Sequence, residues 1–372
     1  MVWANINGER MIVVARRNGI IDIIHPDTGA IQKSFQDIEI QQAKTDKPKP
    51  NQVRFIGLET TDTHLMTCNS NGTLTWTEWT ASTLNIIAHL DKSSTTGGST
   101  IAGPGTDLTI VRAHPIHRHL IAIGGKDIDV QIYDINKFLK KSSKETTKVT
   151  THPRQNKKET KLGLIYQAKN IKNDHLDLPQ PVWIRDLQFM NEEGTQVAVA
   201  THYHQIRLYD FKKARRPVLN VDVGKLPLAT LSVGIDYDHV IFTDTMTDVG
   251  MMNIRNGKVM AQLKGFSGAT RATQIIPAAS FNESSSMNNQ TGNGFSLVSA
   301  GLDRTLRIHE MNTKYRKLEK KAYLKQQLNC VLVDTEFIVP TPELDLEQQE
   351  EEELWNTLDT VQDDKRKKTR LA

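Results

Sequence analysis

The sequence predicts an all-β protein in which four-stranded units repeat around a ring, the architecture of a β-propeller. The first observation is a recurring phrase of strand, short polar turn and strand, whose second strand ends at or near Tyr-Asp. It is found as "GGKDIDVQIYD" at 124–134, as "VAVATHYHQIRLYD" at 197–210 and as "LVSAGLDRTLRIHE" at 297–310. The second observation is that apolar residues alternate or run over only about four to six positions, as in short buried strands. A unit that repeats along one chain indicates a repeat architecture.

Six hairpins are expected along the chain. The first joins Met11–Ala15 to Ile20–Ile24 through Asn18-Gly19, a pair that tolerates the positive φ angles of a tight hairpin turn. The other five also place short apolar strands around a polar turn. In chain order they are His64–Cys68 with Thr73–Glu78, His119–Gly124 with Asp129–Asp134, Gln196–Thr201 with Gln205–Asp210, His239–Thr243 with Asp248–Ile254, and Ser296–Ala300 with Thr305–His309.

Further strand-like segments complete these units to four strands, the composition of a propeller blade. The expected inner strands are Val53–Gly57, Thr109–Ala113, Ile184–Phe189, Leu228–Val233 and Thr270–Ile275, and the expected outer strands include Val218–Val223 and Val259–Leu263. Another strand-like segment, Leu328–Val333, follows the sixth unit. Since propellers commonly close by joining the two ends of the chain, we expect this segment beside the first and last units. The ring then has six blades, or it derives from a seven-bladed parent and its first blade is incomplete.

The composition limits the class of protein to which the chain can belong. The chain has 372 residues, of which 38% are hydrophobic and 24% charged, as in a soluble globular protein with polar appendages. No apolar run approaches about 18 residues, so no transmembrane helix is expected, and the start resembles no secretory signal. Cys68 and Cys330 belong to no CxxC pair, which favours a reducing compartment and buried thiols.

The charge is distributed unevenly along the chain. We expect a propeller at 1–339, with polar insertions at 137–161 and 280–294, and a charged C-terminal tail at 340–372 that is disordered or helical. The tail holds 10 acidic and 5 basic residues, a net of −5, so the rest of the chain carries +9 of the total of +4. A mildly basic body favours an anionic partner such as RNA.

Several phrases resemble one family closely. They are "AKNIKNDHLDLPQPVWIRDLQF" at 168–189, "HQIRLYD" at 204–210, "ARRPVL" at 214–219, and "AGLDRTLRIHEM" followed by "AYLKQQLNCVLV" near the end of the last unit. Their sequence is similar to that of the nucleolar WD-repeat assembly factors of the large ribosomal subunit, the Nop-seven-associated protein family. The similarity covers most of residues 1–333.

This resemblance implies a seven-bladed WD-repeat propeller and a role as a non-enzymatic scaffold in ribosome biogenesis. It implies location in the nucleus and nucleolus, contacts with pre-ribosomal RNA, large-subunit assembly factors and ribosomal proteins, and release by an AAA-type ATPase. No small-molecule substrate, cofactor or membrane partner is expected. The alternative is a WD-repeat adaptor that recognises peptide motifs in a ubiquitin-ligase or chromatin complex.

Candidate binding residues are polar or charged side chains expected on loops, where they are free to contact a partner. For partner or RNA binding they are Lys169, Lys172, Asn173, Asp174, Lys212, Lys213, Arg215, Arg216, Asp303 and Arg304; for nuclear import they are Lys365, Arg366, Lys367, Lys368 and Arg370. Asp174 also has the alternative role of capping a turn. Asp303 has a structural alternative too, because WD repeats often hold an Asp in this turn, although His309 replaces the usual Trp.

The remaining motifs favour structural interpretations. His114, His117 and His119 have ligand-like spacing, but a metal site needs a further convergent ligand, so we expect a turn. The glycine-rich stretch 97–105 lacks the Gly-Lys-Ser/Thr and the following helix of a phosphate-binding loop. No catalytic motif is evident, and the chain is not expected to be an enzyme.

Overall fold

The computed structural model describes residues 1–42, 53–90, 107–142, 163–234, 236–277, 295–311 and 316–335. The chain divides into one unit at Met1–Val333 and another at Asp334–Ala372. In the first unit the described strands form six antiparallel sheets of four strands each. The insertion at 280–294, the tail at 340–372 and residues 143–161 of the other insertion lie outside the described residues.

Each sheet is a meander of four consecutive strands. Sheet 1 holds β1 (Val2–Ile6), β2 (Glu9–Ala15), β3 (Ile20–Ile24) and β4 (Ile31–Gln36); sheet 2 holds β5 (Phe55–Thr60), β6 (His64–Asn69), β7 (Thr73–Glu78) and β8 (Ile86–His89); sheet 3 holds β9 (Leu108–Ala113), β10 (Leu120–Gly125), β11 (Ile128–Asp134) and β12 (Leu164–Gln167). Sheet 4 holds β13 (Ile184–Phe189), β14 (Gln196–Thr201), β15 (Gln205–Asp210) and β16 (Leu219–Asp222); sheet 5 holds β17 (Leu228–Val233), β18 (His239–Asp244), β19 (Val249–Asn253) and β20 (Lys258–Leu263); sheet 6 holds β21 (Thr270–Pro277), β22 (Phe295–Gly301), β23 (Thr305–Met311) and β24 (Arg316–Tyr323).

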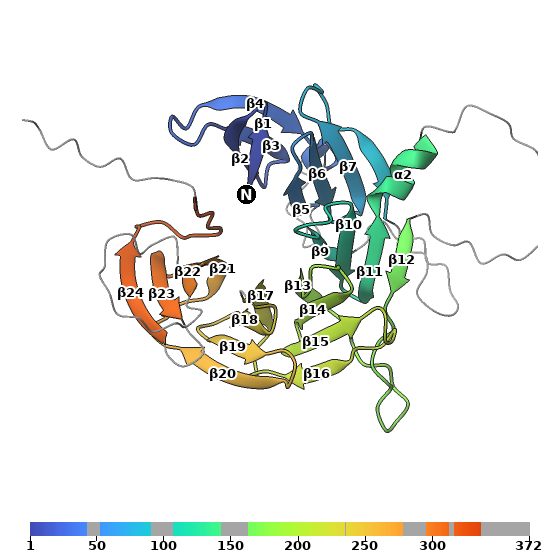
Figure 1. Cartoon of the computed structure of the whole chain (residues 1–372), viewed down its shortest axis with the longest axis vertical. Helices are drawn as coiled ribbons and strands as arrows, with labels where there is room; N and C mark the ends of the chain where they lie inside the picture. Colours follow the sequence, from blue (N-terminus) through green and yellow to red (C-terminus); the bar gives the residue numbers. More distant parts are fainter. Residues whose placement is uncertain are drawn as a thin grey trace, which may run out of the picture. The chain divides into compact units, whose positions relative to one another are not determined.

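The sheets stand around a centre like the blades of a propeller. Figure 1 shows the first strand of each sheet on the inside, and consecutive inner strands contact one another from β1 round to β21. All six expected hairpins form. The WD-type propeller is therefore confirmed, with six complete sheets among the described residues where the resembled family has seven blades.

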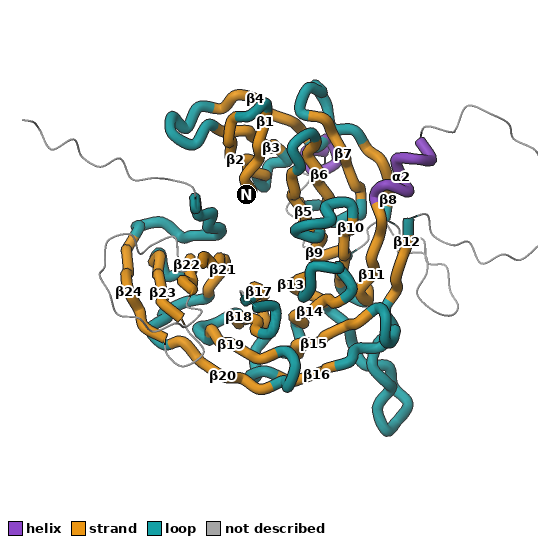
Figure 2. The backbone as a smooth tube through the Cα atoms, viewed as in Figure 1, coloured by secondary structure: helices purple, strands orange, loops and turns teal. Residues whose placement is uncertain are grey.

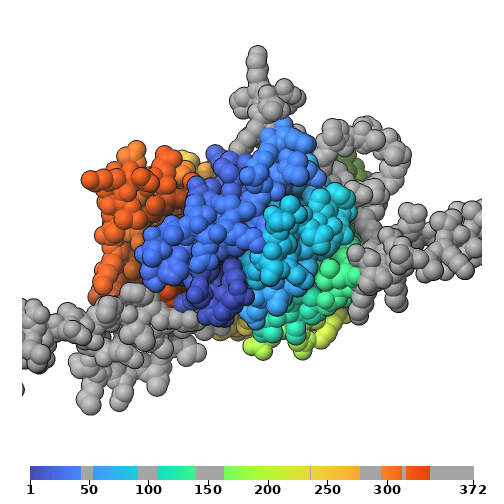
Figure 3. Space-filling model, turned by 90° about the horizontal axis from the view of Figure 1, so that it is seen from above, coloured from blue at the N-terminus to red at the C-terminus, as the bar shows by residue number. Residues whose placement is uncertain are grey.

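Apolar side chains pack between consecutive sheets. Between sheets 1 and 2, for example, Met11, Val13 and Phe35 pack with Leu65 and Trp79, and the surfaces of these sheets (blue and light blue) adjoin in Figure 3. Four similar clusters join sheet 2 to 3, 3 to 4, 4 to 5 and 5 to 6. Since burying one large aliphatic side chain contributes about 1.5–3 kcal/mol, these five interfaces supply most of the stabilisation of the ring.

The junction between sheets 6 and 1 is built differently. The Val333 amide donates to Gln274 Oε1 of β21 at 2.9 Å, and the Val333 carbonyl accepts from Trp3 Nε1 of β1 at 3.0 Å. The expected placement beside the first and last units is confirmed for this residue. However, residues 328–333 form no strand, because they meet their neighbours through single hydrogen bonds and not through a ladder. Cys330 is exposed, so the expectation that both thiols are buried is wrong for it.

Side chains also connect the inner strands around the centre. Thr60 Oγ1 donates to the Trp3 carbonyl at 2.6 Å, Arg112 Nη2 donates to Asp186 Oδ1 at 2.9 Å, the Leu231 amide donates to Asp186 Oδ2 at 2.8 Å, and the Ser232 and Thr273 hydroxyls lie 2.6 Å apart. These bonds fix the inner strands of neighbouring sheets relative to one another. They place polar groups around the centre of the ring.

Among the described residues, two short helices lie outside the sheets. Helix α1 (Ile38–Gln42) follows sheet 1, and helix α2 (Ile135–Ser142) follows β11. The insertion expected at 137–161 thus begins within a helix. The reason is packing: Ile135 and Phe138, three residues apart, are buried in the cluster between sheets 2 and 3, and the Asp134 carboxylate accepts from the Asn136 amide. Among the described residues, no helix has the length and apolar character needed to span a membrane.

Candidate docking surface

Two of the predicted basic clusters meet at the outer rim between sheets 3 and 4. The Lys169 amide donates to the Arg215 carbonyl at 2.7 Å, and Arg215 Nε donates to the Gln167 carbonyl at 2.9 Å. The Tyr166 hydroxyl lies 3.0 Å from both the Ala214 and the Arg215 carbonyl oxygen. The segment between β12 and β13 is consequently held against the turn between β15 and β16. We call these two segments, residues 168–180 and 211–217, the rim.

The first rim segment projects outward as a compact loop (Figure 2, lower right). Asp174 Oδ1 accepts from the Leu176 and Leu178 amides, each at 2.9 Å, and Asn173 Nδ2 donates to Asp177 Oδ1 at 2.8 Å. Asn173 and Asp174 therefore shape the loop, which supports the turn-capping role of Asp174. Contact of either side chain with a partner stays a prediction.

The tip of this loop carries two leucines that the sequence reasoning missed. Leu176 is 66% exposed and Leu178 is 55% exposed. The same rim segment also holds the exposed lysines Lys169 and Lys172. The signal available in the sequence was the pattern Leu-Asp-Leu in a segment otherwise polar. An apolar tip next to basic residues suits a protein partner with an acidic margin.

The basic residues of the rim differ in how far they are neutralised. Lys212 Nζ lies 2.5 Å from Glu193, and Lys213 Nζ lies 3.4 Å from Asp210. Both lysines are about two-thirds exposed, so these pairs contribute little stability. Among the described residues no carboxylate forms an ion pair with Lys169, Lys172 or Arg216. These three cations remain available to an anionic partner.

Buried polar side chains, with Arg207 at their centre, lie beneath the start of the rim loop. Arg207, which is 1% exposed, donates to Gln205 Oε1 at 2.6 Å and to Asn170 Oδ1 at 3.2 Å. Burial raises the pKa of the nearby Asp129 to about 6, against the opposing charge of Arg207. The Asn170 amide side chain in turn donates to the Gln180 carbonyl. The rim loop is thereby anchored to the polar interior between sheets 3 and 4.

Asp303 and Arg304 lie in the turn between β22 and β23, on the opposite side of the ring from the rim (Figure 1). Asp303 accepts from the amide and the hydroxyl of Thr305, at 3.2 and 2.7 Å, and pairs with the buried Arg307. Arg304 is exposed and has a φ of 63°. The structural interpretation of Asp303 is supported by these bonds, and partner contact by either residue stays a prediction.

His309 takes no part in the Asp303 network. Its ring stacks on Phe266 at a centroid distance of 5.5 Å, and both ring nitrogens are buried without a hydrogen-bond partner among the described residues. Burial, together with the charge of Arg307, lowers the pKa of His309 to about 4. The imidazole is neutral at physiological pH and fills the position by packing.

The histidines with ligand-like spacing form a turn. His114 Nδ1 accepts from the Ile116 and His117 amides at 3.1 and 2.8 Å, and His114 Nε2 lies 3.0 Å from the Asn191 carbonyl. Both ring nitrogens of His114 are thus occupied. Within the described ranges, no group of three or more His, Cys, Asp or Glu residues has an arrangement that could hold a metal ion.

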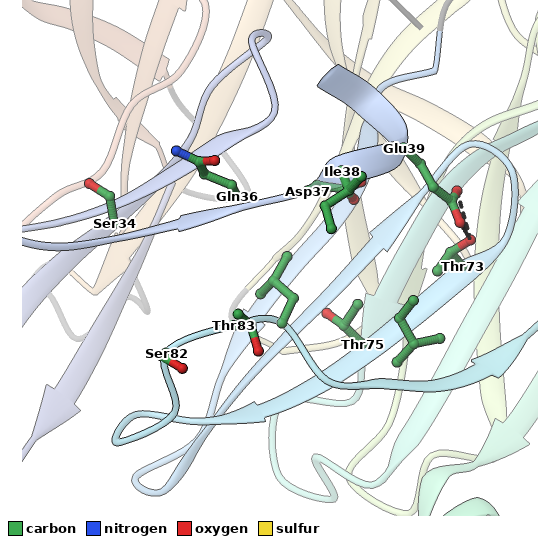
Figure 4. Close-up of a pocket in the computed structure, with 11 residues that line it drawn as sticks. Ser34, Gln36, Asp37, Ile38, Glu39, Thr73, Thr75, Ser82 and Thr83 are labelled. Atoms are coloured by element: carbon green, nitrogen blue, oxygen red, sulfur yellow. Dashed lines mark hydrogen bonds between the residues drawn. The ribbon is translucent and has the colours of Figure 1, made fainter. Parts of the chain in front are cut away.

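A pocket of about 380 Å³ lies between the outer parts of sheets 1 and 2 (Figure 4). Hydroxyl side chains such as Ser34, Thr75 and Thr83 line it. Two carboxylates line it, and both are engaged: Glu39 accepts from the Thr73 hydroxyl and the Asn69 side-chain amide, each at 2.9 Å, and Asp37 accepts from the Ile40 amide at 3.2 Å. None of the residues predicted from the sequence lies there. The bonds of Glu39 attach helix α1 to sheet 2. They do not indicate a chemical step.

The chain was compared with known proteins. No family model matches it. It is 32% identical to WD repeat-containing protein 74 of Homo sapiens over 82% of this chain and 69% of that protein, and 31% identical to the Bos taurus protein of the same name, of which it spans 60%. It is 28% identical to Ribosome biogenesis protein nsa1 of Schizosaccharomyces pombe over 97% of this chain and 85% of that protein.

Solved structures with low identity show the same fold. The chain of the computationally designed Ika8 protein has a TM-score of 0.52 at 12% identity, covering 87% of this chain and 75% of that one. A chain of the mitotic checkpoint complex has a TM-score of 0.55 at 9% identity, covering 88% and 79%. These two likenesses concern the propeller alone. The identity to the human protein shows more: the chain belongs to the WD repeat-containing protein 74 family.

Proposed function

We propose that this protein is a non-enzymatic docking scaffold in ribosome biogenesis. The observation that carries the proposal is the identity to a protein named Ribosome biogenesis protein nsa1 along 97% of this chain. The rim supports a docking role, because it presents exposed leucines and unpaired cations on a loop anchored to the ring. A rigid ring that carries such a loop positions its partners without any chemical step.

A more specific part of the proposal concerns the large ribosomal subunit. The protein docks on nucleolar large-subunit precursor particles through pre-ribosomal RNA and neighbouring assembly factors or ribosomal proteins, and an AAA-type ATPase removes it. The test is affinity purification of the tagged protein from cells, with sequencing of the bound RNA and mass spectrometry of the bound proteins. Large-subunit precursor RNA with assembly factors is the expected result; ubiquitin-ligase subunits or histones would identify an adaptor of the other class.

The rim gives a prediction for this assay. Changing Lys169, Lys172 and Arg216 to Gln removes the three unpaired cations, and we expect recovery of the precursor particle to fall about fivefold or more at moderate salt. The loss follows from charge, since anionic partners are attracted over about 8–10 Å. Changing the exposed Lys225, Lys258 and Lys264 to Gln is the matched control, and an equal loss in this control would rule out the rim.

The basic cluster at 365–370 lies outside the described residues, and we propose it as a nuclear import signal. Deleting residues 340–372 is expected to leave a folded propeller that enters the nucleus less efficiently. Fluorescence microscopy of the tagged, truncated protein measures this. Normal nuclear accumulation in cells where particle binding is blocked would refute the import role.

A further inference from the structure

One end of the ring, where the inner strands begin, carries arginines from three different sheets. Arg54 directly precedes β5, Arg185 lies in β13 and Arg271 lies in β21, the inner strands of sheets 2, 4 and 6. We propose that this end of the ring binds the phosphate backbone of single-stranded RNA. The proposal rests on the function proposed above and deepens it by naming a surface and the chemical group that the surface recognises.

Two of these arginines are placed by the same irregularity of the strands. The pairing of β13 with β14 skips from Ile184 to Asp186, and the pairing of β21 with β22 skips from Thr270 to Ala272. Arg185 and Arg271 are therefore the unpaired residues of two β-bulges. A bulge changes the direction of a side chain relative to the regular ladder, and both bulges occur in inner strands of the ring (Figure 1).

All three arginines stand where the inner strands of sheets 2, 4 and 6 begin: Arg54 directly precedes β5, Arg185 is the second residue of β13 and Arg271 is the second residue of β21. Arg185 is also repelled by the other two. Burial, followed by repulsion from Arg54 and Arg271, lowers the pKa of Arg185. Their convergence across the ring distinguishes them from arginines scattered over a surface.

Asp186, the neighbour of Arg185, offsets only part of this charge. Its carboxylate is engaged by Arg112 Nη2 at 2.9 Å and by the Leu231 amide at 2.8 Å. None of the described carboxylates forms an ion pair with Arg54, Arg185 or Arg271. Three like charges without an ion-pair partner repel one another, and an anion relieves that repulsion.

A tryptophan borders the arginines. The His202 ring stacks on Trp183 at a centroid distance of 4.0 Å, Lys126 Nζ lies 5.3 Å from the Trp183 ring and the Arg185 guanidinium carbon 5.9 Å from it. Trp183 Nε1 and His202 Nδ1 are buried with no hydrogen-bond partner among the described residues. Trp183 is only partly buried, and an aromatic ring beside arginines suits a strand whose bases stack on it.

Phosphate is the anion that fits these donors. Its oxygens accept hydrogen bonds from several directions, and Arg matches their geometry with two parallel donors. An RNA duplex displays its phosphates over an extended surface, whereas an unpaired strand can place single phosphates against a small cluster of arginines. A carboxylate-rich peptide carries the same sign of charge with planar groups, and the experiment below separates it from RNA.

The experiment measures RNA binding by the purified full-length chain. A fluorescently labelled oligouridylate of about 12 nucleotides is titrated by anisotropy, with salt varied between about 50 and 200 mM. Replacing Arg54, Arg185 and Arg271 with Gln is expected to lower the affinity at least about tenfold and to reduce the slope of log affinity against log salt by about 2, because three phosphate contacts are lost. The control, R17Q/R255Q/R316Q, removes the same charge from exposed positions and is expected to change the affinity less than about threefold.

Three results would overturn the proposal. The first is equal RNA affinity of the triple variant R54Q/R185Q/R271Q and of the control R17Q/R255Q/R316Q. The second is an unchanged affinity in R54Q/R271Q, the variant to use if the triple variant does not fold, since both residues are exposed. The third is that the wild-type protein binds an oligoglutamate peptide more tightly than RNA and that the triple variant R54Q/R185Q/R271Q loses this peptide binding. The function proposed above fails separately, when the wild-type protein purified from cells carries no precursor RNA.

Discussion

Replacing Asp303 with Ala is expected to lower the free energy of unfolding by about 3–5 kcal/mol, because it leaves the buried Arg307 guanidinium without its counterion. The Arg307 and Asp303 side chains are 2% and 7% exposed. Arg307 lies 4.8 Å from the Phe266 ring centroid, in surroundings that cannot hydrate the charge. Chemical denaturation followed by fluorescence or circular dichroism measures the loss. Arg304→Ala in the same turn is the control, and its effect should stay within about 0.5 kcal/mol because Arg304 is exposed.

The same change alters the pH dependence of stability. Burial disfavours the charged carboxylate, but the Arg307 and Thr305 donors outweigh burial and hold the pKa of Asp303 at about 2. A depressed carboxyl pKa contributes stability above the unfolded value near 4, and the contribution is lost as the pH falls from about 4 to about 2. The difference between the wild type and Asp303→Ala should therefore shrink over this interval. A fully stable Asp303→Ala variant that only loses a partner would favour the binding role.

Ending the chain at Gln327 is expected to destabilise the ring by at least about 3 kcal/mol relative to ending it at Thr335. The shorter chain loses the two Val333 bonds and the bond from the Leu328 amide to the Gly301 carbonyl at 3.2 Å. Each contributes about 1 kcal/mol, and the half-buried apolar side chains of 328–333 add to this. Thermal and denaturant unfolding of both truncated chains provide the comparison.

The chain ending at Thr335 is the matched control, because it keeps every described residue. We expect it to stay close to the full-length protein in stability, since all the sheets and apolar clusters lie before this point. Equal stability of both truncated chains would mean that Val333 does not close the ring. In that case the contacts between sheets 1 and 6 would have to come from other residues.

The sequence predicts the hairpins well because their determinants are local. Asn18-Gly19 sets the turn of the first hairpin, with Gly19 at a φ of 83°, and short apolar runs mark the strands. Prediction fails where contacts between residues far apart in the sequence decide the local structure. Phe138 and Leu139 lie in a basic, polar stretch, and their burial against sheets 2 and 3 turns its start into a helix. Residues 328–333 are apolar enough for a strand, but no ladder partner is available.

The candidate sites depend even more on distant contacts. Lys169 and Arg215 stand 46 residues apart, and the sequence placed them in separate clusters without indicating that they meet. Arg54, Arg185 and Arg271 come to one end of the ring only because each stands at the start of an inner strand of an alternate sheet. The tertiary arrangement reveals such a cluster, since no local pattern marks its members.

Cryo-electron microscopy of particles purified through this protein would show where the ring docks. We expect the ring on a large-subunit precursor, with unpaired RNA at the end of the ring that carries Arg185 and a protein partner against the rim loop at 168–180. Particles that lack precursor RNA, or a ring seated instead on ubiquitin-ligase or chromatin proteins, would contradict it.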